Sequence, residues 1–245
     1  MLQGQSWPSR CRSTAHPGSV PHAFPATAHA VEDDDLDALQ DKLTNEWRLV
    51  RNDRLRNIKT WVKQEDGKRF RSFRAEAALD GTVEAYVRVL LDFDNYRKWY
   101  WEVLDAKILK KKSDTEYQFY IKHRAPHGVP NRDVPGVLTL EPQTRENRTL
   151  VVRVKAYPDL IPEAPPLVRM RAEDMIIRIS PLAGNRVFVE AEGYVDPGGK
   201  VPGWANNFIQ RTAPYSILVG FNRMMENLEY QESKTPLPFP VFNAP

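Results

Sequence analysis

The feature that most restricts the fold is a stretch of about ninety residues, 103–195, in which apolar and polar side chains alternate with a period of two. Such alternation is typical of β-strands that bury one face. Only short, turn-rich pieces separate the candidate strands, and short connections without helices predict an antiparallel sheet. The expected strands are residues 103–112, 116–124, 134–141, 149–157, 168–180 and 186–195.

The period changes after this stretch, and residues 201–229 predict one helix of roughly 40 Å. Pro202 falls in its first turn, where the missing N–H is harmless, and Pro214 predicts a kink. A helix apolar over so much of its circumference cannot simply cover a sheet. We expect a first apolar stripe to pack on the sheet and a second to face the space beneath the helix. The first is Ala205, Ile209, Ala213, Ile217, Phe221, Met224 and Leu228, and the second is Trp204, Phe208, Thr212, Tyr215 and Val219.

Shorter elements precede the long alternating stretch. Asp35 can cap a helix that continues to Trp47, with leucines on one face. Alternation then predicts strands at residues 58–63 and 70–79. Two short helical segments follow, one after the turn at residues 80–82 and one over residues 95–101. The fold class expected from this order is α+β.

Composition excludes several classes of protein. Hydrophobic residues make up 41% of the 245 residues, yet no apolar run reaches the roughly 18–20 residues that a membrane-spanning helix needs. The single cysteine, Cys11, excludes an intrachain disulfide and a cysteine-based zinc site. Lys and Arg number 35 against 32 Asp and Glu, and residues 31–230 retain a net charge of only +1. A body so close to neutral gives no support to nucleic-acid binding.

The two ends of the chain are expected to lie outside the core. Residues 1–30 hold four prolines and no acid, which favours a disordered segment or a leader. The segment ends Ala28-His29-Ala30, and small residues at these positions suit a signal-peptidase site. A leader would make the protein periplasmic or otherwise exported, and a merely disordered tail would leave it cytoplasmic. The expected folded domain is residues 31–230, followed by a Pro-rich tail at 231–245.

Motifs that carry catalytic chemistry are missing from the sequence. It contains no nucleophile elbow, phosphate loop or dinucleotide-binding glycine pattern. His123 and His127 are four residues apart, but Pro126 lies between them and they fall across a strand end instead of on one helix face. We therefore expect no metal, no cofactor and no catalytic residues.

Four segments, taken in order, resemble the START domain, which is the helix-grip fold of lipid-transfer proteins in the SRPBCC superfamily. They are residues 92–99 (DFDNYRKW), 130–133 (PNRD), 179–182 (ISPL) and 196–204 (DPGGKVPGW). The likeness extends over about residues 47–229 and is greatest to bacterial, exported START-like proteins. It implies a curved antiparallel sheet wrapped around the long C-terminal helix, with two short helices after the first strands.

The resemblance also implies an internal cavity beneath the C-terminal helix for a lipid, fatty acyl or sterol-like molecule. Small residues at alternate strand positions, such as Gly136 and Ala191, are consistent with a void there. The segment from His127 through Gly128 and Val129 to Pro130 matches the loop that borders the ligand entrance in START folds. The expected cavity residues are Tyr120, Leu138, Phe208, Thr212, Tyr215 and Val219, and Trp204 is expected to touch a bilayer transiently at the entrance.

One position departs from the family pattern. Many START domains carry a buried arginine where this chain has Leu138, so head-group recognition is not carried over. The first hypothesis is a monomeric, non-enzymatic protein that binds a hydrophobic ligand and transfers it. The second is a cyclase, aromatase or hydrolase of the same superfamily, for which Tyr120, Thr212 and Tyr215 are the inward polar candidates. The third is an interaction module with a filled pocket.

Overall fold

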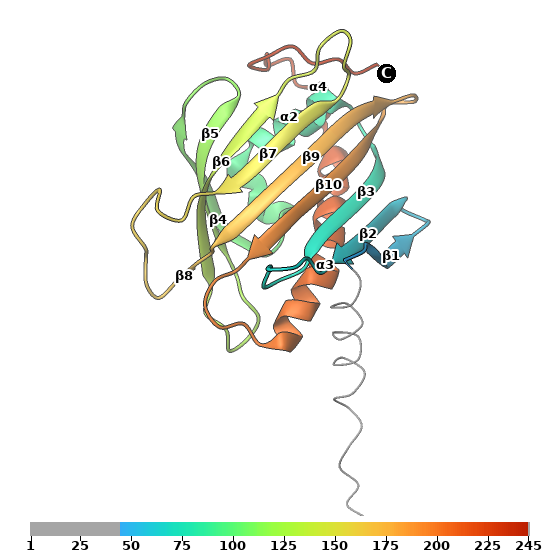
Figure 1. Ribbon diagram of the computed structural model, residues 1–245. Coiled ribbons are helices and arrows are strands. Elements are labelled where there is room, and N and C mark those ends of the chain that lie inside the picture. The colour runs from blue at the N-terminus through green and yellow to red at the C-terminus, as the bar shows by residue number, and fades with distance from the viewer. Residues whose placement is uncertain (1–44, 245) are drawn as a thin grey trace, which may run out of the picture.

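The computed structural model describes residues 45–244 (Figure 1). The strands are β1 (Arg48–Asp53), β2 (Ile58–Lys63), β3 (Ser72–Asp80), β4 (Val103–Lys111), β5 (Glu116–His123), β6 (Arg132–Glu141), β7 (Leu150–Ala156), β8 (Val168–Arg169), β9 (Ala172–Leu182) and β10 (Arg186–Asp196). The helices are α2 (Val83–Leu91), η1 (Phe93–Lys98), α3 (Gly203–Arg223), η2 (Met224–Glu226) and α4 (Leu228–Glu232).

The strands form one curved sheet in the order β1-β2-β3-β10-β9-β7-β6-β5-β4. Every pair along this path is antiparallel, and only β8 pairs in parallel, with β6. α3 lies across one face of the sheet, with α2 and η1 at the same side (Figure 1). The predicted α+β helix-grip architecture, with two short helices after the first strands, is confirmed. No helix among residues 45–244 is long and apolar enough to cross a membrane.

The alternating side chains bury one face of each central strand against the helices. On β10, Val187 and Val189 are at most 1% exposed, while the neighbouring Glu190 lies near Arg74 on the opposite face. α2 begins at Val83 because the Thr82 hydroxyl accepts a hydrogen bond from the Ala85 N–H. The main core therefore lies between the concave face of the sheet and the helices.

Two predicted elements differ from the structure, and one strand of the structure was not predicted. The expected strand 168–180 is split, because Val168 pairs in parallel with Arg132 whereas β9 starts at Ala172 and pairs with β10. The expected continuous helix 201–229 ends at Arg223, and Asn227 caps the separate helix α4. β1 was not predicted. Most of the helix expected over residues 35–47 lies outside the described residues, as does the segment 1–30 with its candidate cleavage site.

The Pro-rich segment after α4 was predicted to lie outside the core, and this is wrong for part of it. Leu237, Phe239 and Val241 are partly buried against the main core. The backbone of Phe242 donates to and accepts from the Gln143 side-chain amide, at 2.7 and 2.9 Å. Alternate apolar residues between the prolines thus give this segment a packing face.

The two edge strands of the sheet are irregular. β1 shifts its register against β2 between Leu49 and Arg51, and β4 shifts twice against β5. β4 also exposes most of its side chains, among them Lys107, Lys110 and Lys111.

Candidate ligand-binding cavity

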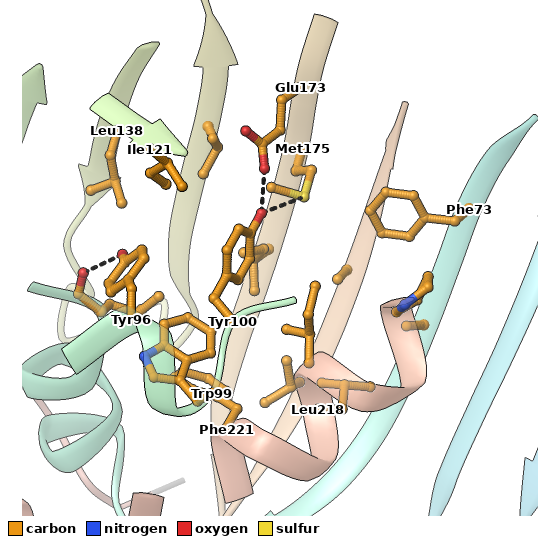
Figure 2. Close-up of a pocket in the computed structure, with 18 of the residues that line it drawn as sticks. Phe73, Tyr96, Trp99, Tyr100, Ile121, Leu138, Glu173, Met175, Leu218 and Phe221 are labelled. Atoms are coloured by element: carbon orange, nitrogen blue, oxygen red, sulfur yellow. Dashed lines mark hydrogen bonds between the residues drawn. The ribbon is translucent and has the colours of Figure 1, made fainter. Parts of the chain in front are cut away.

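A cavity of two adjoining chambers lies between α3 and the concave face of the sheet. The inner chamber, of about 70 Å³, lies against the second half of α3 (Figure 2). It is bordered by Trp99, which follows η1, by Phe119 and Ile121 of β5, and by Leu138 of β6. The outer chamber, of about 140 Å³, lies under the first half of α3. Six residues line both chambers, and they are Phe73, Tyr100, Glu173, Met175, Pro214 and Ile217.

Aromatic rings form one wall of the inner chamber. The Trp99 ring lies 4.9 Å from both the Tyr96 and Phe221 rings, and Phe93 stacks on Tyr96 at 4.4 Å. The Tyr96 hydroxyl donates to the Leu90 carbonyl at 2.7 Å, so its polar atom is satisfied locally. Edge-to-face and stacked rings of this kind give a rigid, apolar surface.

One acidic side chain lies at the junction of the two chambers. Glu173 is only 3% exposed, and its Oε1 accepts a hydrogen bond from the Tyr100 hydroxyl at 2.5 Å (Figure 2). Burial, and then the Glu173 charge, raise the pKa of the Tyr100 hydroxyl well above its ordinary value, so this hydroxyl keeps its proton. Glu173 Oε2 has no hydrogen-bond partner among the described residues.

A histidine lines the outer chamber near Tyr100. His123 Nδ1 lies 2.9 Å from the Trp101 carbonyl oxygen, which can only accept, so Nδ1 carries the hydrogen. The other ring nitrogen, Nε2, is buried and has no partner in the described part of the chain. The cavity is therefore apolar over most of its wall and polar around Tyr100.

The overall fold is similar to that of solved START structures. A STAR-related lipid transfer protein from Xanthomonas axonopodis is 29% identical, with a TM-score of 0.67 over 74% of this chain and 99% of that one. The chain has the START fold. Human STARD10, 19% identical, gives 0.64 over 85% and 86% of the two chains, and human StAR-related lipid transfer protein 5, 16% identical, gives 0.63 over 81% and 95%.

A sequence relative covers much of the same region. An uncharacterised protein from Pseudomonas aeruginosa is 23% identical over 184 residues, which is 75% of this chain and 89% of the relative. No family model matches the chain.

In this START fold, the stripe of α3 that faces the cavity is the first one. Ala205, Ile209 and Ala213 line the outer chamber, Ile217 lines both chambers, and Phe221 lines the inner one. The prediction that the second stripe faces the cavity is therefore wrong. This rotation brings Gly220 close to the backbone just after η1, where a Cβ on Gly220 would come 2.6 Å from the Trp99 carbonyl oxygen.

The four predicted cavity residues of the second stripe lie elsewhere. Phe208 is 51% exposed, and its ring lies 6.1 Å from that of Trp101. Thr212 borders a surface groove beside β1, and the Tyr215 hydroxyl donates to Asp53 Oδ2 at 2.7 Å. Val219 borders a shallow groove beside η1. They are absent from the lining of both chambers because the other helix face is turned to the sheet.

Tyr120 was also expected in the cavity, and it lies on the other face of the sheet. Its neighbours Phe119 and Ile121 line the inner chamber, so the period of two turns Tyr120 outward. Its hydroxyl donates to Asp133 Oδ2 at 3.0 Å, and burial, followed by Asp133, raises its pKa to about 12. Asp133 also forms a buried ion pair with Arg169 at 3.0 Å. Arg169 also donates to the carbonyls of Pro158, Ile161 and Pro162, so the pair holds the segment after β7, and neither residue lines a chamber.

The expected entrance loop does border the outer chamber. Val129 lines the chamber, together with Ala125 and Pro126 at the start of the loop, while His127, Gly128 and Pro130 are exposed. Trp204, at the start of α3, is 57% exposed and lines neither chamber. Leu138 lies in the inner chamber, as expected from its position.

Small strand residues indicated the void only in part. Ala191 lines the inner chamber. Gly136 does not, because a Cβ there would come 2.5 Å from Phe119 Cζ and 2.7 Å from the Lys155 carbonyl oxygen. Glycine at this position reflects close packing between strands.

Sequence reasoning missed Glu173 and Tyr100. The sequence does contain an indication of Glu173. It is spaced by two from Met175 and by four from Ile177, so all three side chains point to the same inward face of the strand, where an acid is unusual. Tyr100 was hidden within an aromatic run that also predicts plain core packing. Residues 45–244 contain no group of three His, Cys, Asp or Glu side chains placed to hold a metal ion.

Proposed function

We propose that this chain binds a hydrophobic small molecule, of the lipid, fatty acyl or sterol-like class, in the two chambers beneath α3. The observation that carries the proposal is the continuous apolar lining that α3 and the sheet share through Met175, Pro214 and Ile217. Removing an acyl chain from water into such a lining contributes roughly 0.8 kcal/mol per CH₂ group.

The cavity is large enough to hold a small ligand, which a core filled by the protein's own side chains could not do. An apolar cavity of roughly 150 Å³ stays dry and accepts benzene. The outer chamber alone, at about 140 Å³, is close to that size, and the inner chamber adjoins it. This void argues against an interaction module whose pocket is filled by its own side chains.

Binding and transport of a ligand is a better proposal for this cavity than catalysis. Catalysis by Tyr100 would need its phenolate or a proton transfer near neutral pH, and the raised pKa opposes both. The Glu173 oxygen beside it already accepts a hydrogen bond. Two of the START structures above are named lipid transfer proteins, which supports the same proposal.

Transfer is the finer form of the proposal. Trp204 and Phe208 are exposed at the same end of α3 as the outer chamber, so a transient contact of these side chains with a bilayer would put the chamber close to lipid. One chain encloses both chambers, so we propose that it acts as a monomer. Export across a membrane, with residues 1–30 as a leader, remains part of this proposal.

The binding proposal is tested by filling the outer chamber. Ala213→Trp adds a large ring to its wall and is expected to weaken binding of 1-decanol at least tenfold in isothermal titration calorimetry, and to remove co-purified lipid seen by native mass spectrometry. Phe208→Trp is the matched control, because residue 208 faces away from both chambers, and it should bind as the parent does. Circular dichroism shows whether both variants are folded. Absence of any bound lipid and of decanol binding by the parent protein would contradict the proposal.

A further inference from the structure

Three polar side-chain atoms without partners line the outer chamber. They are Glu173 Oε2, His123 Nε2 and Gln210 Oε1, each buried and without a hydrogen bond from the described residues. Buried polar atoms are nearly always satisfied in folded proteins, so a cluster of exceptions in one cavity needs a physical explanation.

All three atoms accept hydrogen bonds. Glu173 Oε1 is occupied by the Tyr100 hydroxyl, which keeps its proton, so the vacant atom of that carboxyl is Oε2. His123 Nδ1 donates to the Trp101 carbonyl, and in an imidazole with its hydrogen on Nδ1 the other nitrogen, Nε2, is an acceptor. The amide oxygen of Gln210 is an acceptor by its chemistry.

The arginine side chains that border the same chamber have partners. The Arg132 guanidinium donates to the backbone carbonyls of Pro130, Pro197 and Lys200. Arg71 donates to the Asn207 amide oxygen at 3.4 Å. Arg124 is mostly exposed, with a carboxylate oxygen of Glu102 at 3.9 Å. The chamber thus offers vacant acceptors around a mostly apolar wall.

We propose that Glu173, assisted by His123, selects guests whose apolar body ends in a hydrogen-bond donor, a hydroxyl or amino group, over guests of the same shape that can only accept. This rests on the proposed binding function and specifies which members of the hydrophobic class are held. The site lies at the junction of the chambers, so the donor group would sit beside Tyr100 while the apolar body fills the inner or outer space (Figure 2).

The selection is measured with two isomers. 1-Decanol carries a donor and 1-methoxynonane has the same formula but only accepts. The unaltered protein is expected to bind 1-decanol at least tenfold more tightly in isothermal titration calorimetry, and decylamine tests whether an amino donor is held as well as a hydroxyl. Equal affinities for the two isomers would overturn the proposal while leaving the binding function intact. If neither isomer binds, both proposals are wrong.

Variants assign the selection to Glu173. Glu173→Leu is expected to bring the affinity ratio of the two isomers close to one while 1-methoxynonane still binds, because the apolar wall remains. Glu173→Gln keeps an acceptor oxygen and nearly the same shape, so it should keep part of the ratio and provides a folded test should the leucine variant not fold. Glu190→Leu, on the outer face of β10, is the matched control and should keep the full ratio. An unchanged ratio in both Glu173 variants would contradict the assignment.

Discussion

The two halves of α3 are held very differently. Five buried residues lie from Pro214 onward, whereas only Ala205 is buried before it. The second half is fixed by Phe221, whose ring lies 4.4 Å from Tyr86, and by the Asn222 side chain, which accepts from the Asp80 N–H at 3.0 Å. The first half covers the outer chamber, and most of its residues that do not line the chamber are exposed. The difference teaches that one continuous helix can serve both as a packed core element and as the roof of a binding site.

Pro214 lies at the boundary between these halves. It has no N–H, so the carbonyl of Gln210 lacks its usual helical partner at the place where the two chambers meet. A helix weakened there can move its first half without disturbing the second. We therefore expect a guest to enter beneath the first half, and the following predictions test how firmly the second half is held.

The largest effect is expected from alkaline pH. Tyr86, Tyr96 and Tyr100 pack around the second half, and burial raises the pKa of each hydroxyl well above 10. The unfolded chain gives up these protons above about pH 10 and the folded chain keeps them. Each tyrosine therefore lowers the free energy of unfolding by about 1.4 kcal/mol per pH unit above that point.

Urea unfolding between about pH 9 and pH 11 measures this loss. Tyr100→Phe removes one of the protons and should make the decrease with pH shallower. A free energy of unfolding that stays constant over the range would show that the second half is not enclosed as described.

A smaller effect is expected from the glycines of α3. Gly220→Ala places a Cβ 2.6 Å from the Trp99 carbonyl oxygen and 2.9 Å from its Cα, and backbone atoms cannot yield as a flexible side chain can. Overpacking of this kind costs about 1–3 kcal/mol, which exceeds the gain of up to about 1 kcal/mol from alanine's helix propensity. The melting temperature should fall by roughly 2–4 °C per kcal/mol of net loss.

Gly203→Ala is the matched control in the first half. Nothing lies within 4 Å of a Cβ at that position, so the variant should be as stable as the parent or slightly more so. Equal melting temperatures for the two variants in a calorimetric scan would contradict the conclusion that the second half of α3 is packed more tightly than the first.

The smallest effect concerns the hydrogen bond that joins α3 to β1. The Tyr215 hydroxyl is the main cause that lowers the pKa of Asp53 to about 2, with Arg56 adding to it. Tyr215→Phe should raise this pKa toward its ordinary 3.8, which an NMR titration of the carboxyl group measures. The bond stabilises the fold above about pH 4, and its contribution is lost as the pH falls toward 2. An unchanged Asp53 pKa would show that the bond does not form in solution.

The sequence predicts the architecture well because the fold depends on periodicity. The alternation over residues 103–195 and the change of period after Asp196 are sufficient for a sheet and a covering helix. Local periodicity does not predict which distant strands pair. Val168 and Arg169 continue the alternation of β9 in the sequence, but in the structure they form β8 and pair with β6.

The site was predicted less well because the rotation of a helix apolar on two faces is not a local property. A choice between two stripes depends on contacts such as that of Gly220 with Trp99, which lie far apart in the sequence. The stripe predicted to face the cavity carries Trp204, Phe208 and Tyr215, whereas the stripe that does face it includes the small residues Ala205 and Ala213. A void is left where side chains are short, so small residues on a helix would have been the better guide.

Among residues 45–244 the sheet ends in two edge strands, β1 and β4, which pair with no further strand on their outer sides, and such edges can pair with the strand of another molecule. The lysines of β4 oppose this, since two such strands brought together would place like charges side by side. The register shifts at both edges add a local twist that a flat partner could not follow. The apolar cavity can therefore remain open to small hydrophobic ligands while the edge strands of the sheet oppose aggregation.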